Sequence, residues 1–255
     1  MTPEEPPAFN LTEVDRQVLA QTDDEFILHD WEDLKAIIAR NDLGILKRKP
    51  SDLTRYLAWS HETKLKYGTI TNYICQHRLG WIPQPSPPTS TTSTASTSTT
   101  PSIPSTPSSS TGTTGTPSST TETPPSFPYL NPTPFAHPHD YKILRNDWPY
   151  GMTPGISHLV VWLRTPVATK PENGDVTDES RALIEAFVQR TFVERLAREE
   201  ADGEGAKERA KDQVLWFKNW TALQSVRSLE HIHVLVRDVP ERILVEWTGE
   251  DVPRH

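Results

Sequence analysis

The sequence predicts an α+β fold, in which an antiparallel sheet crossed by a long helix packs against an N-terminal helical layer. Three features predict this fold: amphipathic helical patterns in residues 21–82, a Ser/Thr/Pro-rich stretch at 83–126, and β-branched runs that flank one long helix in 127–255. We expect the first and last of these parts to form one domain, and residues 1–20, which begin acidic and Pro-rich, to be disordered. The 255 residues leave ample chain for a sizeable core.

Three segments of the N-terminal part repeat apolar residues at helical spacing. Asp30 is the expected N-cap of the first helix, and Ser51, which follows Pro50, is the expected N-cap of the second. Apolar helix faces must be buried, so we expect the three helices to pack against the C-terminal half. The third helix is short, and its buried face is expected to contain Ile70, Tyr73, Ile74 and His77.

The stretch from 83 to 126 is almost entirely Ser, Thr and Pro. It carries one charge, Glu122, and only Ala95 and Ile103 as apolar residues. Such a segment cannot bury enough apolar surface to offset the entropy that ordering would cost. We therefore expect a disordered insertion within one domain.

The C-terminal half alternates strand patterns with one helix. "YKILRNDWPYG" (141–151) reads as a strand that runs into a turn, and "ISHLVVWLRTP" (156–166) is a β-branched run that a proline ends. A long amphipathic helix follows at 178–200. Two more strands are expected in "QVLWFKN" and "HIHVLVRD", and "ERILVEW" (241–247) is a possible last strand. The order strand, strand, helix, strand, strand suggests an antiparallel sheet.

Two histidines stand at the head of the "HIHVLVRD" strand. In an extended strand Ile232 and Val234 share the apolar face, so His231 and His233 are neighbours on the opposite face. Neutral imidazoles so placed can serve as nucleophile, proton shuttle or metal ligand. Two other interpretations stay open: polar residues covered by helices on a sheet, or a metal site completed by "HPHD" at 137–140, with His137, His139 and Asp140.

Composition excludes several classes of function. The formal charge of −8 is dispersed, and the longest basic run, "KRK" at 47–49, is too short for nucleic-acid binding. One cysteine, Cys75, permits neither an intrachain disulfide nor a Cys-based zinc site. We find no secretory signal and no apolar run of about 18 residues, so we expect a cytosolic protein without membrane contact.

Two longer blocks, "ILRNDWPYGMTPGISHLVVW" and "FKNWTALQSVRSLEHIHVLV", resemble the histidine-triad superfamily and the related galactose-1-phosphate uridylyltransferases. The resemblance implies a histidine-triad-like sheet with a nucleotide cleft, in which His231 or His233 attacks phosphorus. It implies a small-molecule ligand, a nucleotide or an amino-sugar derivative, and no cofactor. Around the two histidines it implies base or ribose contacts and phosphate contacts from Asn146, Asp147, His158, Asn219, Gln224 and Ser225. The aromatic residues of "NDWPYG", Trp148 among them, either pack in the core around a rigid turn or lie against a base or sugar ring.

The chain departs from the superfamily in its last strand. The family strand carries three alternating histidines, whereas here Leu229 or Leu235 stands in one of the three places. We prefer His231 as the nucleophile, because the residues that follow "HIHVL" then match the residues that follow the histidines in the family strand. A non-catalytic protein that binds nucleotides or sugar phosphates is the alternative.

A closer resemblance covers nearly all of the chain outside the insertion. The blocks "SDLTRYLAWSHETKLKYGTITNYICQHRLGW", "YKILRNDWPYGMTPGISHLVVWLRTP" and "LWFKNWTALQSVRSLEHIHVLVRD" are similar to the fungal family called N-acetylglucosamine-induced protein 1. This resemblance implies a fungal, cytosolic protein expressed in response to N-acetylglucosamine. It implies no particular reaction, and it places both flanks of the insertion in one family domain.

Overall fold

A four-stranded antiparallel sheet forms the centre of the protein. The computed structural model describes residues 11–82, 127–199, 205–220 and 223–249. The strands are β1 (Tyr141–Arg145), β2 (Ile156–Leu163), β3 (Val214–Phe217) and β4 (Glu230–Arg237), in the order β1-β2-β4-β3 with every pair antiparallel. This confirms the expected α+β class and the four strands expected before residue 240.

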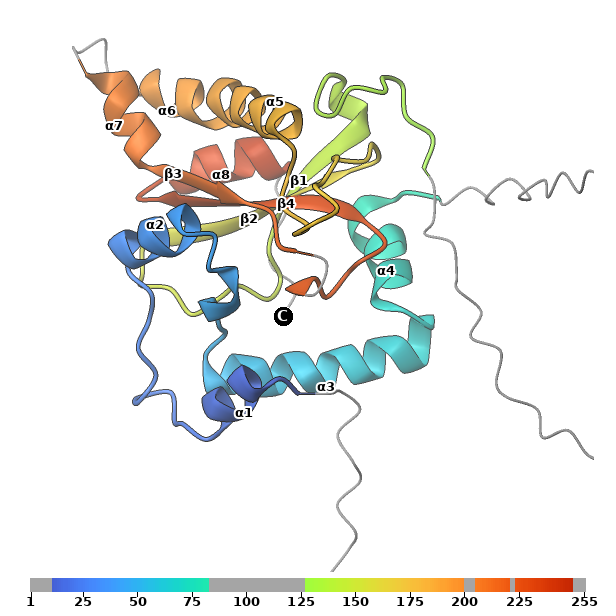
Figure 1. The fold of residues 1–255 in the computed structure, drawn as a ribbon, viewed down its shortest axis with the longest axis vertical. Coiled ribbons are helices and arrows are strands. Elements are labelled where there is room, and N and C mark those ends of the chain that lie inside the picture. The colour runs from blue at the N-terminus through green and yellow to red at the C-terminus, as the bar shows by residue number, and fades with distance from the viewer. Residues whose placement is uncertain (1–10, 83–126, 200–204, 221–222, 250–255) are drawn as a thin grey trace, which may run out of the picture.

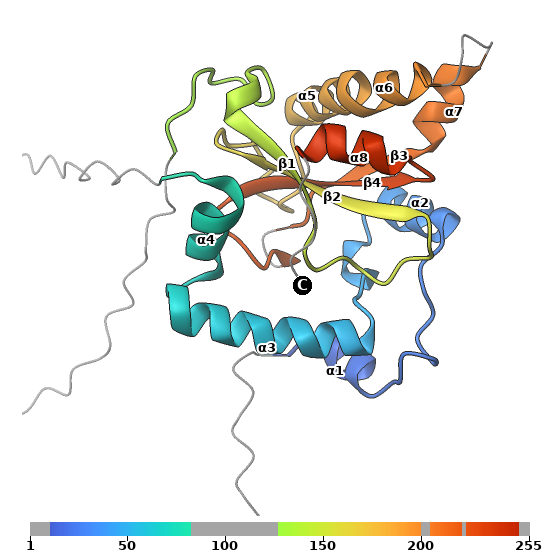
Figure 2. The ribbon, with the colours of Figure 1, turned by 180° about the vertical axis from the view of Figure 1, so that it is seen from behind.

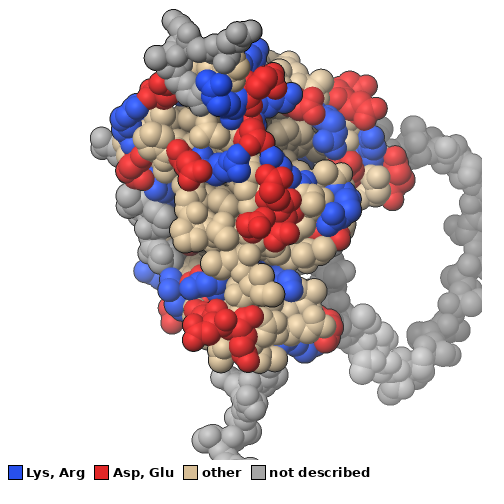
Figure 3. Space-filling view, turned by 90° about the vertical axis from the view of Figure 1, so that its left-hand side faces the viewer, with Lys and Arg blue, Asp and Glu red and all other residues tan. Residues whose placement is uncertain are grey.

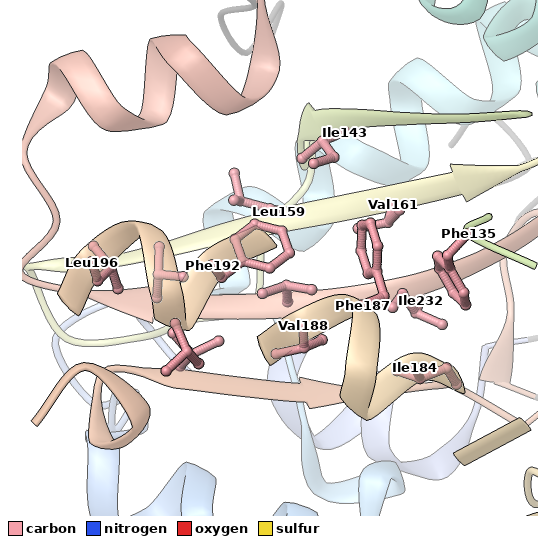
Figure 4. Close-up of a cluster of buried hydrophobic side chains, with 14 of the residues drawn as sticks. Phe135, Ile143, Leu159, Val161, Ile184, Phe187, Val188, Phe192, Leu196 and Ile232 are labelled. Carbon is pink, nitrogen blue, oxygen red and sulfur yellow. The ribbon is translucent and has the colours of Figure 1, made fainter. Parts of the chain in front are cut away.

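One face of the sheet is covered by C-terminal helices (Figure 1). Helix α5 (Asp178–Val188) continues through a π-helical turn, η4 (Gln189–Val193), into α6 (Glu194–Ala197), and α7 (Ala206–Asp212) and α8 (Glu241–Thr248) complete the layer. Figure 4 shows the apolar core between α5, α6 and the strands, to which Ile143, Leu159, Val161, Ile184, Phe187, Phe192 and Ile232 contribute.

The π-helical turn keeps one face of the long helix in the core. It adds a residue to the turn between Val188 and Phe192, so that both side chains, and Leu196 after them, remain buried. Ile184 and Phe187 on the preceding turns are buried on the same side, and Leu183 is only partly covered. An extra residue of this kind changes which later side chains face the core, and the amino-acid composition of the helix does not reveal it.

The expected last strand is wrong, because residues 241–248 form helix α8. Pro240 precedes the helix, and Ile243, Leu244 and Thr248 are buried with Trp247 packed beside them. This spacing of 1, 4 and 5 residues fits a helical face rather than a strand face. α8 lies on the same side of the sheet as α5 and α6 (Figure 2).

The N-terminal helices cover the other face (Figures 1 and 2). Two hydrophobic clusters join this layer to the sheet, one that contains Leu34 and Leu235 and one that contains Ile74 and Val160. The elements are α1 (Glu13–Leu19), α2 (Trp31–Ala39), η1 (Leu43–Ile45), α3 (Pro50–Tyr67), α4 (Ile70–Tyr73) and the π-helical η2 (Ile74–Leu79), and a short η3 (Pro138–Asp140) precedes β1.

Several expectations for this layer need correction. Asp30 caps α2 as expected, but Lys49 rather than Ser51 precedes α3. His77 is exposed, because η2 turns Arg78 rather than His77 inward. Helix α1 begins within the segment expected to be disordered, where Thr12 and Asp15 form a capping box. Residues 1–10 and the insertion at 83–126 lie outside the described residues.

The turn between β1 and β2 is held by the N-terminal segments. The backbone of Gly151 donates to Lys47 O at 2.7 Å and accepts from His29 N at 3.0 Å. A Cβ on Gly151 would lie 3.0 Å from Phe26 Cζ and closer still to Cε1. Only glycine therefore fits at this contact while Phe26 stays in place.

Charged residues of both signs alternate on the face drawn in Figure 3, and neither sign forms a continuous patch there. Among the helices of the described residues, none is both long enough and apolar enough to cross a membrane.

Candidate functional site

Three buried histidines lie together on the sheet face that the N-terminal layer covers. His231 and His233 on β4 are 5% and 7% exposed, and His158 on β2 is 5% exposed. Val160 is the cross-strand partner of His233, so His158 lies diagonally next to it, with its Nε2 2.9 Å from His233 Nδ1. The prediction that His231 and His233 share the face opposite Ile232 is confirmed.

Both ring nitrogens of His233 are engaged. Asn219 Nδ2 lies 3.2 Å from His233 Nε2, and the ring stacks on Phe217 with centroids 4.8 Å apart and planes at 10°. Because an amide nitrogen can only donate, Nε2 accepts and the proton of the neutral ring is on Nδ1, directed at His158. His233 is thus a fixed central member of a hydrogen-bonded chain.

The turn after β1 closes this chain. Asn146 Nδ2 lies 3.2 Å from His158 Nε2, and Asn146 Oδ1 accepts from the backbone of Trp148 at 3.0 Å. Tyr150 stacks on His158 with centroids 5.3 Å apart, and its hydroxyl accepts from Asn219 Nδ2 at 3.1 Å. Residues from β1, β2, β3 and β4 and their loops thus converge on one polar network, which we call the histidine network (Asn146, Tyr150, His158, Asn219, His233).

His231 has a different environment. Its Nδ1 lies 2.7 Å from Leu229 O, and its ring packs against Trp162 with centroids 4.7 Å apart. A carbonyl oxygen only accepts, so Nδ1 carries the proton of the neutral ring and Nε2 carries the lone pair. Nε2 makes no hydrogen bond to a described residue.

Burial keeps all three imidazoles neutral at pH 7. Desolvation lowers the pKa of His158 to about 3, with a further contribution from the positive charge of Arg48. The same cause lowers the pKa of His231, and that of His233 falls well below its usual range. Neutral rings can accept or donate protons along a network and can offer a lone pair to an electrophile.

The other expected site residues are dispersed. Gln224 supports the histidine network, because its Nε2 donates to Asn219 O at 2.7 Å, whereas Ser225 is exposed on the same loop. Asp147 accepts from Arg78 Nε at 3.1 Å in a buried ion pair. Trp148 packs edge-on against Tyr56 with centroids 5.6 Å apart. Asp147 and Trp148 therefore join the two halves of the domain.

The metal alternative gains no support from the part of the chain that the structure describes, where no group of three His, Cys, Asp or Glu residues could hold an ion. His137 Nδ1 accepts from the backbone of His139 at 3.2 Å, in a polar turn. The Asp140 carboxylate is occupied by the backbone N–H groups of Leu130 and Asn131.

Arg48 and Tyr150 belong to the surroundings of the site but were not among the expected residues. The Arg48 guanidinium lies 4.2 Å from the ring centroid of Tyr56 and 5.8 Å from that of Tyr150. Its Nε donates to Trp148 O at 3.1 Å. No local pattern connects position 48 with position 150, although "KRK" and "NDWPYG" both stand out in the sequence.

Sheet, helical layer and buried histidines together define an α+β protein with a polar centre beneath its N-terminal helices. The chain belongs to the family described as protein of unknown function (DUF3605), whose model matches residues 30–237.

Relatives confirm the resemblance to N-acetylglucosamine-induced protein 1. The chain is 28% identical over 221 residues to "N-acetylglucosamine-induced protein 1" of Candida albicans, covering 85% of this chain and 71% of the relative. It is 26% identical over 229 residues to "Uncharacterized protein YPL067C" of Saccharomyces cerevisiae, covering 88% of each chain. A solved structure titled "Crystal Structure of HTC1" matches with a TM-score of 0.49 and 24% identity, over 86% of this chain and 91% of that one.

Proposed function

We propose that this protein is a cytosolic nucleotide or nucleotide-sugar hydrolase or transferase of the cellular response to N-acetylglucosamine, with a histidine-triad-like site and His231 as its nucleophile. The observation that carries the proposal is the 2.7 Å contact between His231 Nδ1 and Leu229 O. It holds the proton on Nδ1 and leaves the Nε2 lone pair for attack. The printed name of the Candida relative supports the link to N-acetylglucosamine.

The proposed reaction has two displacement steps at phosphorus. His231 Nε2 forms a bond to phosphorus while the P–O bond to the leaving group breaks, and the departing oxygen takes a proton from water. Water or a sugar phosphate then attacks the nucleotidyl-histidine and gives its proton to the hydroxide left by the first step, while the P–N bond breaks and its electron pair returns to Nε2. Asn219 and Gln224 are the proposed donors on the phosphate side, and Asn146 is the proposed contact of the base or ribose.

His233 is the weaker candidate for the nucleophile. Its two ring nitrogens already contact His158 and Asn219, so attack by either nitrogen would first break a buried hydrogen bond. We assign His233 and His158 a positioning role in the proposed site. This assignment agrees with the preference for His231 from the sequence.

A second function is favoured by one observation, the burial of His231, which is 5% exposed. A protein that binds nucleotides or sugar phosphates without turning them over would need no access to Nε2. Such a protein would act as a regulator in the same amino-sugar response.

Turnover by the full chain separates the two functions. We would incubate wild type and His231→Ala with nucleotides, UDP-N-acetylglucosamine and N-acetylglucosamine phosphates, and measure both cleavage and thermal unfolding. A ligand at 100 times its Kd adds about 2.7 kcal/mol, which raises Tm by several degrees. His61→Asn is the matched control, because His61 is exposed on α3.

Cleavage that His231→Ala loses and His61→Asn keeps would support the enzyme. A rise in Tm without cleavage would favour the binding protein. Neither cleavage nor a rise in Tm with any of these compounds would exclude both.

A further inference from the structure

The "KRK" run places three cations next to one another but in unlike surroundings. Lys49 Nζ pairs with Asp23 at 3.2 Å and lies 4.0 Å from Asp52. Arg48 is half-buried and forms no ion pair with any carboxylate of the described residues. Its only hydrogen bond to a described residue is the one that Nε donates to Trp148 O. The N–H groups of both Nη atoms are therefore left for another acceptor.

The contrast with Arg78 shows what a covered arginine normally has. Arg78 is paired with Asp147, and the two side chains are 2% and 8% exposed. Taking a cation partly out of water costs free energy that an anion can offset. Arg48 lacks such an anion within the described chain, although the rings of Tyr56 and Tyr150 shield part of it.

Arg48 is also adjacent to the histidine network. It lies 5.8 Å from the centroid of Tyr150, and Tyr150 in turn stacks on His158 and accepts from Asn219. The positive charge of Arg48 also contributes to the lowered pKa of both His158 and His233. A guanidinium that has no carboxylate partner among the described residues, and that lies beside neutral imidazoles and amide donors, suits an anionic ligand.

We propose that Arg48 binds a phosphate group with both Nη atoms at the edge of the histidine network. A guanidinium offers parallel N–H donors that match two phosphate oxygens, and Tyr56 and Trp148 O hold its plane in place. The proposal rests on the proposed function for one point only, that the phosphate belongs to a nucleotide or sugar phosphate substrate. A free phosphate ion has the same chemistry.

The test measures anion binding by full-length protein, independent of turnover. Inorganic pyrophosphate, inorganic phosphate, UDP and N-acetylglucosamine 6-phosphate are titrated calorimetrically into wild type, Arg48→Gln and Arg48→Lys. Arg55→Gln is the matched control. Like Arg48, Arg55 contacts an aromatic ring, that of Trp148 at 5.9 Å, but Arg55 is exposed and pairs with Asp52. Tm of each variant without ligand reports folding.

We expect Arg48→Gln to weaken binding of pyrophosphate about 10- to 100-fold, the loss of charge-assisted hydrogen bonds. Arg48→Lys should weaken it about fivefold, since an ammonium gives a point charge without the paired donors. Arg55→Gln should leave the Kd unchanged. Tighter binding of UDP than of both inorganic ions would identify the source as a nucleotide, and tighter binding of N-acetylglucosamine 6-phosphate would identify a sugar phosphate.

Binding of all four anions with the same Kd in wild type and Arg48→Gln would overturn the proposal, as would the absence of binding in wild type. If Arg48→Gln does not fold, Arg48→Lys decides, and an unchanged Kd there overturns the paired contact. Failure of the proposed function looks different: anion binding that depends on Arg48, with no cleavage of any nucleotide. Conversely, cleavage that His231→Ala abolishes, with kcat and KM intact in Arg48→Gln, would overturn the Arg48 site alone.

Discussion

The two faces of the sheet are formed by the same strands, but one face is apolar and the other contains buried polar side chains. On the face under α5, α6 and α8, β2 and β4 present Leu159, Val161, Ile232 and Val234 to an apolar core. On the opposite face the alternate positions of the same strands hold His158, His231 and His233 among helices from the other half of the domain. The first face needs volume and shape, whereas the second needs a partner for each polar atom.

The two faces therefore depend on different kinds of contact. Apolar residues pack in many combinations of similar volume, so the face under α5 tolerates exchange of one aliphatic side chain for another. A buried imidazole or carboxylate without its partner costs far more than the bond it makes. The four predictions below test this contrast, from the largest expected effect to the smallest.

Phe187→Ala should give the largest loss, on the apolar face. The side chain is fully buried between Phe135, Tyr141 and Phe192. Its removal leaves a cavity and should lower the free energy of unfolding by roughly 3–5 kcal/mol, measured by urea denaturation. A loss below about 1 kcal/mol would mean that the core under α5 collapses around the cavity or is already loose. Leu183→Ala, at a partly covered position of the same helix, should cost less.

Arg78→Met tests the polar side and should cost about 3 kcal/mol, because it removes the guanidinium that Asp147 contacts at 3.1 Å in a buried ion pair. The double variant Arg78→Met/Asp147→Leu removes both charges and should recover most of this loss. Urea unfolding of the two single variants and the double variant gives the coupling energy. If the loss in the double variant equals the sum of the two single losses, the ion pair between Arg78 and Asp147 does not contribute to stability.

The buried histidines of the polar face should make the stability depend on pH. Folding lowers the pKa of His158 to about 3, and those of His231 and His233 also fall. The unfolded chain therefore binds protons below pH 6.5 that the folded chain does not, so stability is complete above that pH and falls as the pH drops toward the folded pKa values.

His233→Gln should remove one such group and reduce the loss of unfolding free energy between pH 7.5 and 5 by about 2 kcal/mol. The measurement is urea unfolding across this range, with exposed His61→Gln as the control that keeps the wild-type slope. Equal slopes in all three proteins would mean that the buried rings take up protons in the native state.

The smallest effect is expected where neither face is disturbed. Thr177 Oγ1 accepts from Ser180 N at 3.2 Å and caps α5. Thr177→Ala should cost about 1 kcal/mol, and Thr177→Ser should restore most of it. Thermal unfolding is sufficient for this comparison, and a loss as large as that of Phe187→Ala would contradict a local capping role.

Alternation along β4 predicted the faces of His231, His233 and Ile232, because a strand has a fixed period of two. The contact between His158 and His233 could not be predicted, since it depends on the register that sets Val160 opposite His233. Arg48 reaches the site from the N-terminal half, about 100 residues from Tyr150 along the chain, and no local pattern reports such a distance. "ERILVEW" was misassigned because a short apolar run fits a strand and a helix almost equally well.

Gly151 also limits how the sequence can diverge. An alanine there meets the ring of Phe26, but a smaller residue at position 26 would open room for it. If Phe26 is replaced by a smaller residue first, an alanine at position 151 can follow without a steric clash. In the reverse order, the intermediate has alanine at 151 and phenylalanine at 26, and selection would act against this clash. The order of the two substitutions in any lineage is set by packing.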